Sequence, residues 1–159
     1  MAMTAIERGR LIEAFYPAGE LETATPLRRL GGAALDIVLV VVTLVIGYVI
    51  WFLIVAPRGQ TPGKQLTGMY IMREDGSRAG GWYTVLREIV VEGLLFGLIS
   101  SLTFYLGFII GALWCTWDRD RQCLWDKITS TYVAYSPDGY KPLTRTEYLE
   151  RGSRPPRDL

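Results

Sequence analysis

Ionisable side chains next to long apolar runs are the residues of this sequence that could do chemistry. Asp36 directly precedes Ile37 to Ala56, a run of twenty residues without an ionisable side chain. Seven residues are almost two helical turns, so Arg29 shares a helical face with Asp36 and is its natural partner. A charge in hydrocarbon is costly and is usually paired inside the protein. Asp36 is therefore predicted to form an ion pair or a site for a proton or cation.

A pair of glutamates precedes the second apolar run. Glu88 and Glu92 lie four residues apart, on one face of a predicted helix that also carries Arg87. If both carboxyl groups are shielded from water, one holds a proton near neutral pH, which suits a proton-coupled carrier. The alternative is a structural clamp that ties helix ends to short strands, and its members would be Arg29, Asp36, Arg87 and Asp126.

Other chemistries find little support in the composition. The 159 residues include no histidine, so the commonest general base and metal ligand are missing. Cys115 and Cys123 are eight residues apart and read as packing residues, so we expect no metal site and no cofactor. Gly59 and Gly63 enclose three residues where a phosphate-binding loop needs four. A net charge of +1 gives no sign of a nucleic-acid partner, and no nucleophile motif indicates an enzyme.

Two apolar runs indicate that the lipid bilayer is the solvent for much of the chain. The second run, Gly93 to Trp117, is as free of charge as the first. Neither starts where a cleaved secretory signal would lie, so both should remain in the mature protein. The fold class predicted is an all-α membrane protein with short cytoplasmic β-strands.

The distribution of arginine and lysine decides between two topologies. Basic residues precede the first run, lie between the runs and follow the second, and the positive-inside rule assigns all three regions to the cytoplasm. This requires each run to enter the membrane and return, which gives two tandem hairpins of four short transmembrane helices. Hydropathy alone gives the alternative of three transmembrane helices. The hairpin topology places both termini of this multi-pass membrane protein in the cytoplasm.

An internal parallel repeat supports the hairpins. Val42 to Ile50 aligns with Leu102 to Ile110, with a threonine and a glycine coinciding. After a two-residue insertion, Gln60 to Ile71 aligns with Gln122 to Val133, and upstream Leu27-Arg28 aligns with Leu86-Arg87. Each half is then an arginine-led helix, a tight turn, a returning helix and a short strand.

The remaining segments frame this repeated unit. Residues 1–25 are predicted to be a cytoplasmic segment, either an amphipathic helix or a tail followed by a linker at 17–24. Residues 26–136 form the transmembrane domain, beginning with a helix at Thr25-Pro26. Within it, Leu66 to Met72 and Thr129 to Tyr135 are expected to pair as neighbouring strands, with Tyr70 near Tyr132. Residues 137–159 read as a solvated cytoplasmic tail.

Several separated motifs, in order, resemble the RDD family of bacterial membrane proteins, over about Leu27 to Tyr135. They are Arg28-Arg29-Leu30 leading to Asp36, Gly59-Gln60-Thr61-Pro62-Gly63-Lys64, Arg73-Glu74-Asp75-Gly76-Ser77, Asp118-Arg119-Asp120-Arg121-Gln122, and Trp125-Asp126-Lys127-Ile128 with Thr131.

The family is named after one arginine and two aspartates. The resemblance implies that these are Arg29 (or Arg28), Asp36 and Asp126. Here the stretch between Asp36 and the Gly-Gln-Thr is shorter than in many relatives, and Trp125 stands where histidine is frequent. Some members have been linked to cation/proton exchange, so the resemblance implies transport loosely. It also implies that the membrane is a bacterial plasma (inner) membrane.

Two functions follow as expectations. One is a small carrier for cations, protons or a small solute, working as a homo-oligomer because four short helices enclose little volume. The other is an accessory or assembly subunit of a larger membrane complex. The candidate ion-pair or proton-binding residues are Arg28, Arg29, Asp36, Arg87, Glu88, Glu92, Asp118 and Asp126, and the candidate cytoplasmic loop motif is Gly59, Gln60, Thr61, Pro62, Gly63 and Lys64.

Overall fold

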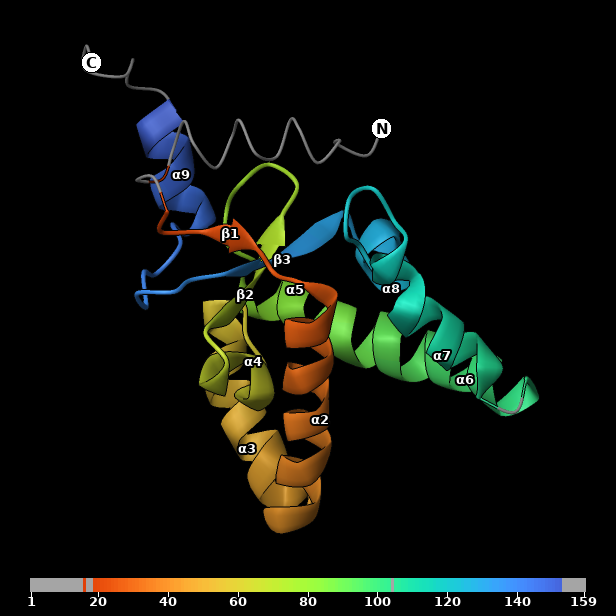
Figure 1. Cartoon of the computed structure of the whole chain (residues 1–159). Coiled ribbons are helices and arrows are strands. Elements are labelled where there is room, and N and C mark those ends of the chain that lie inside the picture. Colours follow the sequence, from red (N-terminus) through yellow and green to blue (C-terminus); the bar gives the residue numbers. More distant parts are fainter. Residues whose placement is uncertain (1–15, 17–18, 104, 153–159) are drawn as a thin grey trace.

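Two helical hairpins, one after the other along the chain, extend from a small antiparallel sheet (Figure 1). The computed structural model describes residue 16 and residues 19–103 and 105–152. In the first half the elements are β1 (Glu22–Thr23), α2 (Pro26–Val42), α3 (Ile46–Val55), η1 (Ala56–Arg58), α4 (Pro62–Leu66) and β2 (Met69–Arg73). In the second they are α5 (Gly81–Val85), η2 (Leu86–Leu95), α6 (Phe96–Leu102), α7 (Leu106–Leu113), η3 (Trp114–Thr116), α8 (Leu124–Ile128), β3 (Thr131–Tyr135) and α9 (Arg145–Gly152).

The first hairpin starts at a threonine cap and reverses through a tight turn. The Thr25 hydroxyl accepts a hydrogen bond from the Arg28 N–H at 3.3 Å and caps α2, whose first residue is proline. The chain reverses through positive φ at Leu44 and Val45. A Cβ on Gly47 would lie 2.9 Å from Thr43 Cβ, so only glycine lets α3 start this close to α2.

The second hairpin repeats these devices. Its first arm runs from Gly81 to Leu102 through α5, the π-helical η2 and α6. Thr103 ends this arm, Tyr105 has positive φ, and a Cβ on Gly107 would lie 3.0 Å from Thr103 Oγ1. The threonine and glycine that coincide in the sequence repeat therefore build the same turn twice.

The repeat continues through the short helices into the sheet. Gln60 Nε2 donates to the Met69 carbonyl at 2.9 Å, and its equivalent Gln122 donates to the Thr131 carbonyl at 2.7 Å. Both glutamines are buried. Each one ties the loop before a short helix to the first residue of the strand that follows it.

The sheet has the strand order β1-β3-β2. Strands β2 and β3 are antiparallel, and Ile71 lies opposite Val133, its equivalent in the repeat, so a local twofold axis passes between them. The predicted pairing is confirmed, although α4 takes up Leu66 and the strands begin at residues 69 and 131. Tyr70 and Tyr132 share one buried cluster.

Two expectations about the ends of the chain are wrong. The stretch predicted as a linker contains β1, which pairs with β3, and it buries Leu21 and Ala24. The stretch predicted as a solvated tail buries Leu143 and Tyr148 against the sheet. The predicted N-terminal amphipathic helix lies outside the described residues.

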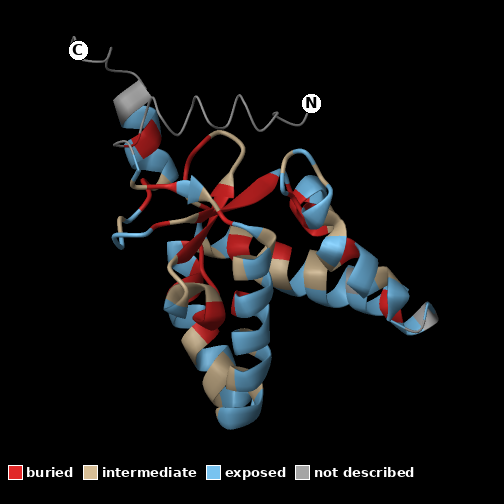
Figure 2. Cartoon of the chain, in the orientation of Figure 1, coloured by how far each residue is buried: buried red, intermediate tan, exposed pale blue. Residues whose placement is uncertain are grey.

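The apolar surface lies on the hairpins, away from the sheet. The sheet is largely buried, whereas α2, α3, α6 and α7 expose many large apolar side chains (Figure 2). The chain reverses within each apolar run, as the hairpin topology requires. Within residues 19–103 and 105–152, no single helix combines the length and the apolar character needed to cross a membrane.

Candidate functional site

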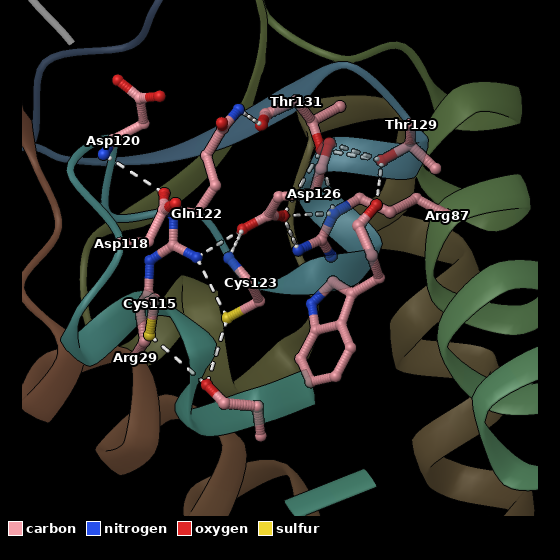
Figure 3. A network of polar contacts seen from close by, with 12 residues as sticks. Arg29, Arg87, Cys115, Asp118, Asp120, Gln122, Cys123, Asp126, Thr129 and Thr131 are labelled. Atoms are coloured by element: carbon pink, nitrogen blue, oxygen red, sulfur yellow. Dashed lines mark hydrogen bonds and ion pairs between the residues drawn. The ribbon is translucent and has the colours of Figure 1, made fainter. Parts of the chain in front are cut away.

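Asp126 is the centre of a buried polar network (Figure 3). It lies in the first turn of α8, where one carboxylate oxygen accepts from the Cys123 N–H at 3.1 Å. Arg29 Nη1 donates to the same oxygen at 2.5 Å. Arg87 Nη2 and Nε donate to the other oxygen, the latter at 3.0 Å. Asp126 therefore joins α2 of the first half to η2 and α8 of the second.

Arg87 extends the network to two further carboxylates. Its guanidinium is buried, with the residue only 1% exposed, and Nη1 pairs with Glu88 and lies 3.5 Å from Glu92 Oε2. Glu88 in turn accepts from Lys64 Nζ at 3.2 Å, and Lys64 lies in α4 of the first half. Glu88 and Glu92 thus pair with the same arginine, which their spacing on one helical face had not predicted.

The formal charges of the network balance. Its basic side chains are Arg29, Lys64 and Arg87, and its carboxyl groups are Glu88, Glu92 and Asp126. A buried ion loses hydration worth several kcal/mol, which only close partners offset. Burial opposes ionisation of Asp126, but Arg87 and then Arg29 overcome it and hold the pKa of this carboxyl well below its usual range.

The repeat relates two of these ion pairs with their charges exchanged. Because Leu27-Arg28 aligns with Leu86-Arg87, Arg29 is equivalent to Glu88, and the later alignment makes Lys64 equivalent to Asp126. Arg29–Asp126 and Glu88–Lys64 are therefore symmetry-related contacts between the halves. In each, a hairpin helix of one half reaches the short helix of the other.

Asp36 is not part of this network, and the expected pairing with Arg29 is wrong. Asp36 accepts from the Gly63 N–H and the Thr61 hydroxyl, each at 2.6 Å, and from the Tyr48 hydroxyl at 2.9 Å. It holds α2, α3 and the start of α4 together. Arg29 instead pairs with Asp126, 97 residues away in the sequence.

The loop motif from Gly59 to Lys64 is built around Asp36. Gly59 has φ of 68° in the turn before α4, Thr61 caps α4, and Pro62 is its first residue. A Cβ on Gly63 would lie 2.7 Å from Asp36 Cγ, so the close approach of α4 to α2 requires glycine here. The motif is thus a packing and capping device, with Lys64 reaching the buried network.

The other predicted site residues lie beside the network. The Arg28 guanidinium stacks over the Tyr135 ring, 3.2 Å from its centre. Asp118 pairs with Lys127 at 2.6 Å and accepts from the Gln122 N–H at 3.0 Å. Burial acts against ionisation of Asp118, but hydrogen bonds from Lys127 and Gln122 lower its pKa.

Sequence reasoning missed one polar partner and gave no role to two others. Tyr48, which donates to Asp36, was not singled out. Thr131 and Gln122 were named only as parts of family motifs, although Thr131 accepts from Arg87 and Gln122 donates to a strand carbonyl. The repeat carried a signal for Gln122, because Gln60 stands at the equivalent position. Tyr48 carried none, since a hydroxyl beside apolar residues is common.

A small cavity of about 50 Å³ adjoins the network. Its charged lining residues are Arg29, Lys64, Arg87 and Glu92. Within the described part of the chain, Arg29 Nε and Nη2 and Glu92 Oε2 have no hydrogen-bond partner. Polar groups around a space of this size are suited to bind one or two water molecules. Among the described residues, no three histidine, cysteine, aspartate or glutamate side chains are grouped to hold a metal ion.

The fold and site define a class of small, mostly helical proteins in which two repeated hairpin–strand units are joined through a buried aspartate held by two arginines. Residues 14–130 match the RDD family, and the chain belongs to that family. It is also similar to the uncharacterized protein YckC of Bacillus subtilis (strain 168), with 31% identity over 143 residues that cover 77% of this chain and 91% of YckC. No solved structure gives a significant match.

Proposed function

We propose that this RDD protein resides in a bacterial inner membrane, with its two hairpins in the lipid and the sheet and both termini in the cytoplasm. The proposal is supported by the apolar side chains that α2, α3, α6 and α7 expose. The basic residues on either side of both runs support this orientation. The returning helices are short, so local thinning of the bilayer would accommodate them.

Within that membrane, the chain acts as a non-enzymatic accessory or assembly subunit. The observation that carries this proposal is the position of Asp126, which is 0% exposed and held by Arg29 and Arg87. A carboxylate whose two oxygens both accept from charged partners has a structural role. It fixes the angle between the hairpins and the sheet, and so presents both hairpins as a rigid surface to a partner in the lipid.

The test is purification in mild detergent of the wild-type protein and of a variant in which Asp126 is replaced. The wild-type protein is expected to copurify with a stoichiometric membrane partner, and Asp126→Asn to lose it. Asp118→Asn is the matched control, because Asp118 also pairs with a cation nearby but has no role between the halves. A wild-type protein that purifies alone as a homo-oligomer would contradict the accessory role.

The alternative is proton-coupled exchange of a cation. It is favoured by Glu92, whose Oε2 faces the small cavity without a hydrogen-bond partner among the described residues and lies beside Glu88 and Arg87. A carboxyl group in such a position could bind and release a proton. In reconstituted vesicles, Glu92→Gln would then abolish ion-driven flux, whereas Glu22→Gln, on the exposed β1, would leave it unchanged. Absence of flux in the wild type would remove this alternative.

A further inference from the structure

A second hollow, away from the buried network, lies where β2, the start of α5 and the start of α9 meet. Its volume is about 430 Å³, within the range of ligand-binding clefts. Three arginines and two aromatic residues are among those that line it: Arg73, Arg78, Arg145, Trp82 and Tyr83.

The hollow carries unbalanced positive charge. Within the described residues, neither Arg78 nor Arg145 makes an ion pair, and Arg73 Nε is 3.8 Å from Asp75. No aspartate or glutamate is among the described residues that line the hollow. An anion would therefore enter the hollow with at least two free guanidinium groups available to it.

Main-chain hydrogen bonds hold Arg73 and Arg78 at the edge of the hollow. The Arg73 N–H donates to the Ser77 carbonyl and the Arg78 N–H to the Leu143 carbonyl, each at 2.8 Å. The Arg73 guanidinium also lies over the Tyr83 ring, 4.4 Å from its centre. The main-chain bonds fix where the Arg73 and Arg78 side chains start, and the ring contact restrains the Arg73 guanidinium, which therefore loses less side-chain entropy on binding a phosphate than a mobile one does.

The position of the hollow indicates the source of the anion. Trp82 is 79% exposed and is the second residue of the helical arm that leads into the second hairpin. Exposed tryptophan at the start of an apolar helix is typical of the membrane–water interface. Arg73 ends β2 and Arg78 is bridged to Met72 of β2, so both belong to the sheet, which the proposed membrane placement sets at the headgroups of the cytoplasmic leaflet.

We propose that this hollow binds the phosphate-bearing headgroup of an anionic phospholipid. Arg78 and Arg145 contact the phosphate oxygens, Arg73 adds positive charge, and Trp82 packs against the upper part of the acyl chains. The inference rests on the membrane placement proposed above. It adds a specific lipid site that neither the clamp nor the carrier alternative requires.

The membrane placement is tested first, by washing membranes with alkaline carbonate. Retention in the pellet supports the placement, and release would contradict the proposed function whatever the hollow binds. Lipid binding is then measured on the detergent-purified full chain by native mass spectrometry, with phosphatidylglycerol and phosphatidylcholine as probes.

The variant Arg78→Gln/Arg145→Gln removes the two unpaired charges from the hollow. The matched control, Arg58→Gln/Arg119→Gln, removes the same charge from exposed positions outside it. We expect the wild type and the control to prefer phosphatidylglycerol by about tenfold, and the hollow variant to bind both lipids within about twofold of each other. Equal loss of preference in the control, or no preference in the wild type, would overturn the proposal. Displacement of the bound lipid by millimolar inorganic phosphate would also overturn it, in favour of a soluble phosphate ligand.

Discussion

Arg29 and Glu88 occupy equivalent positions in the two repeats, and each pairs with the short helix of the opposite repeat. Arg29 binds Asp126 in α8, and Glu88 binds Lys64 in α4 at 3.2 Å. The symmetry of the fold is therefore kept while the charges are exchanged. Exchanged charges allow each half to recognise the other and disfavour pairing of two identical halves, in which like charges would meet.

This relationship predicts a measurable coupling between Lys64 and Glu88. In a double-mutant cycle of Lys64→Ala and Glu88→Ala, we expect a coupling of about 1–2 kcal/mol in the free energy of unfolding, because both side chains are largely buried. The control cycle uses Lys127 and Asp118, whose lysine is more exposed, and should give below about 1 kcal/mol. Equal couplings would show that the contact between the halves has no special role.

Removing the charge of Asp126 should destabilise the protein strongly. Asp126→Asn leaves Arg29 and Arg87 buried without their common partner, which costs about 3–5 kcal/mol. Thermal unfolding in detergent, followed by near-ultraviolet circular dichroism, measures the effect. The control Asp118→Asn, nearer the surface, should cost about 1 kcal/mol or less. A melting temperature for Asp126→Asn equal to that of the control would argue against a clamp.

Gly63 should tolerate no side chain. In Gly63→Ala the new methyl group would meet Asp36 Cγ at 2.7 Å and push α4 from α2, for a loss of about 1–3 kcal/mol. Gly31→Ala is the matched control, since a Cβ there meets nothing within 4 Å and alanine favours the helix. Yields of folded protein after size-exclusion chromatography compare the two. Normal yield of Gly63→Ala would show that α4 does not pack on α2 this closely.

The stability should fall at acid pH because the pKa of Asp126 is lowered in the folded state. A lowered pKa adds stability above the unfolded value of about 4, and this contribution is lost as the pH falls through the folded value. The part of the stability that Asp126 contributes should therefore be lost below about pH 4, and the melting temperature should drop there. The drop should be smaller in Asp126→Asn, and a drop of equal size would assign it to other carboxyl groups.

How far the sequence predicted this structure can be judged from particular residues. The Thr-x-x-x-Gly turns, the two hairpins and the paired strands follow from local spacing and from the repeat, and the structure has them. The partner of Arg29 could not be predicted in this way. Helical spacing offered Asp36, but the sheet register brings Asp126 closer, and Asp36 already binds three donors from the first half.

The same limit explains what was missed at the ends of the chain. Strand β1 has two residues and no periodic pattern, so it exists only because β3 offers a free edge. Tyr148 lies among charged residues that read as solvated, yet it is buried against the sheet. Both contacts depend on tertiary packing, which a local sequence pattern cannot predict.

The placement of the hairpins in the membrane is tested most directly by cysteine labelling in intact cells. Single cysteines at Ser101, by the tip of the second hairpin, and at Asp138, in the loop after β3, are introduced after Cys115 and Cys123 are replaced by serine. A membrane-impermeant maleimide should label Ser101→Cys from outside, and Asp138→Cys only after the cells are opened. Labelling of Asp138→Cys in intact cells would contradict the cytoplasmic sheet, and equal protection of both positions until the cells are opened would contradict a hairpin that crosses the bilayer.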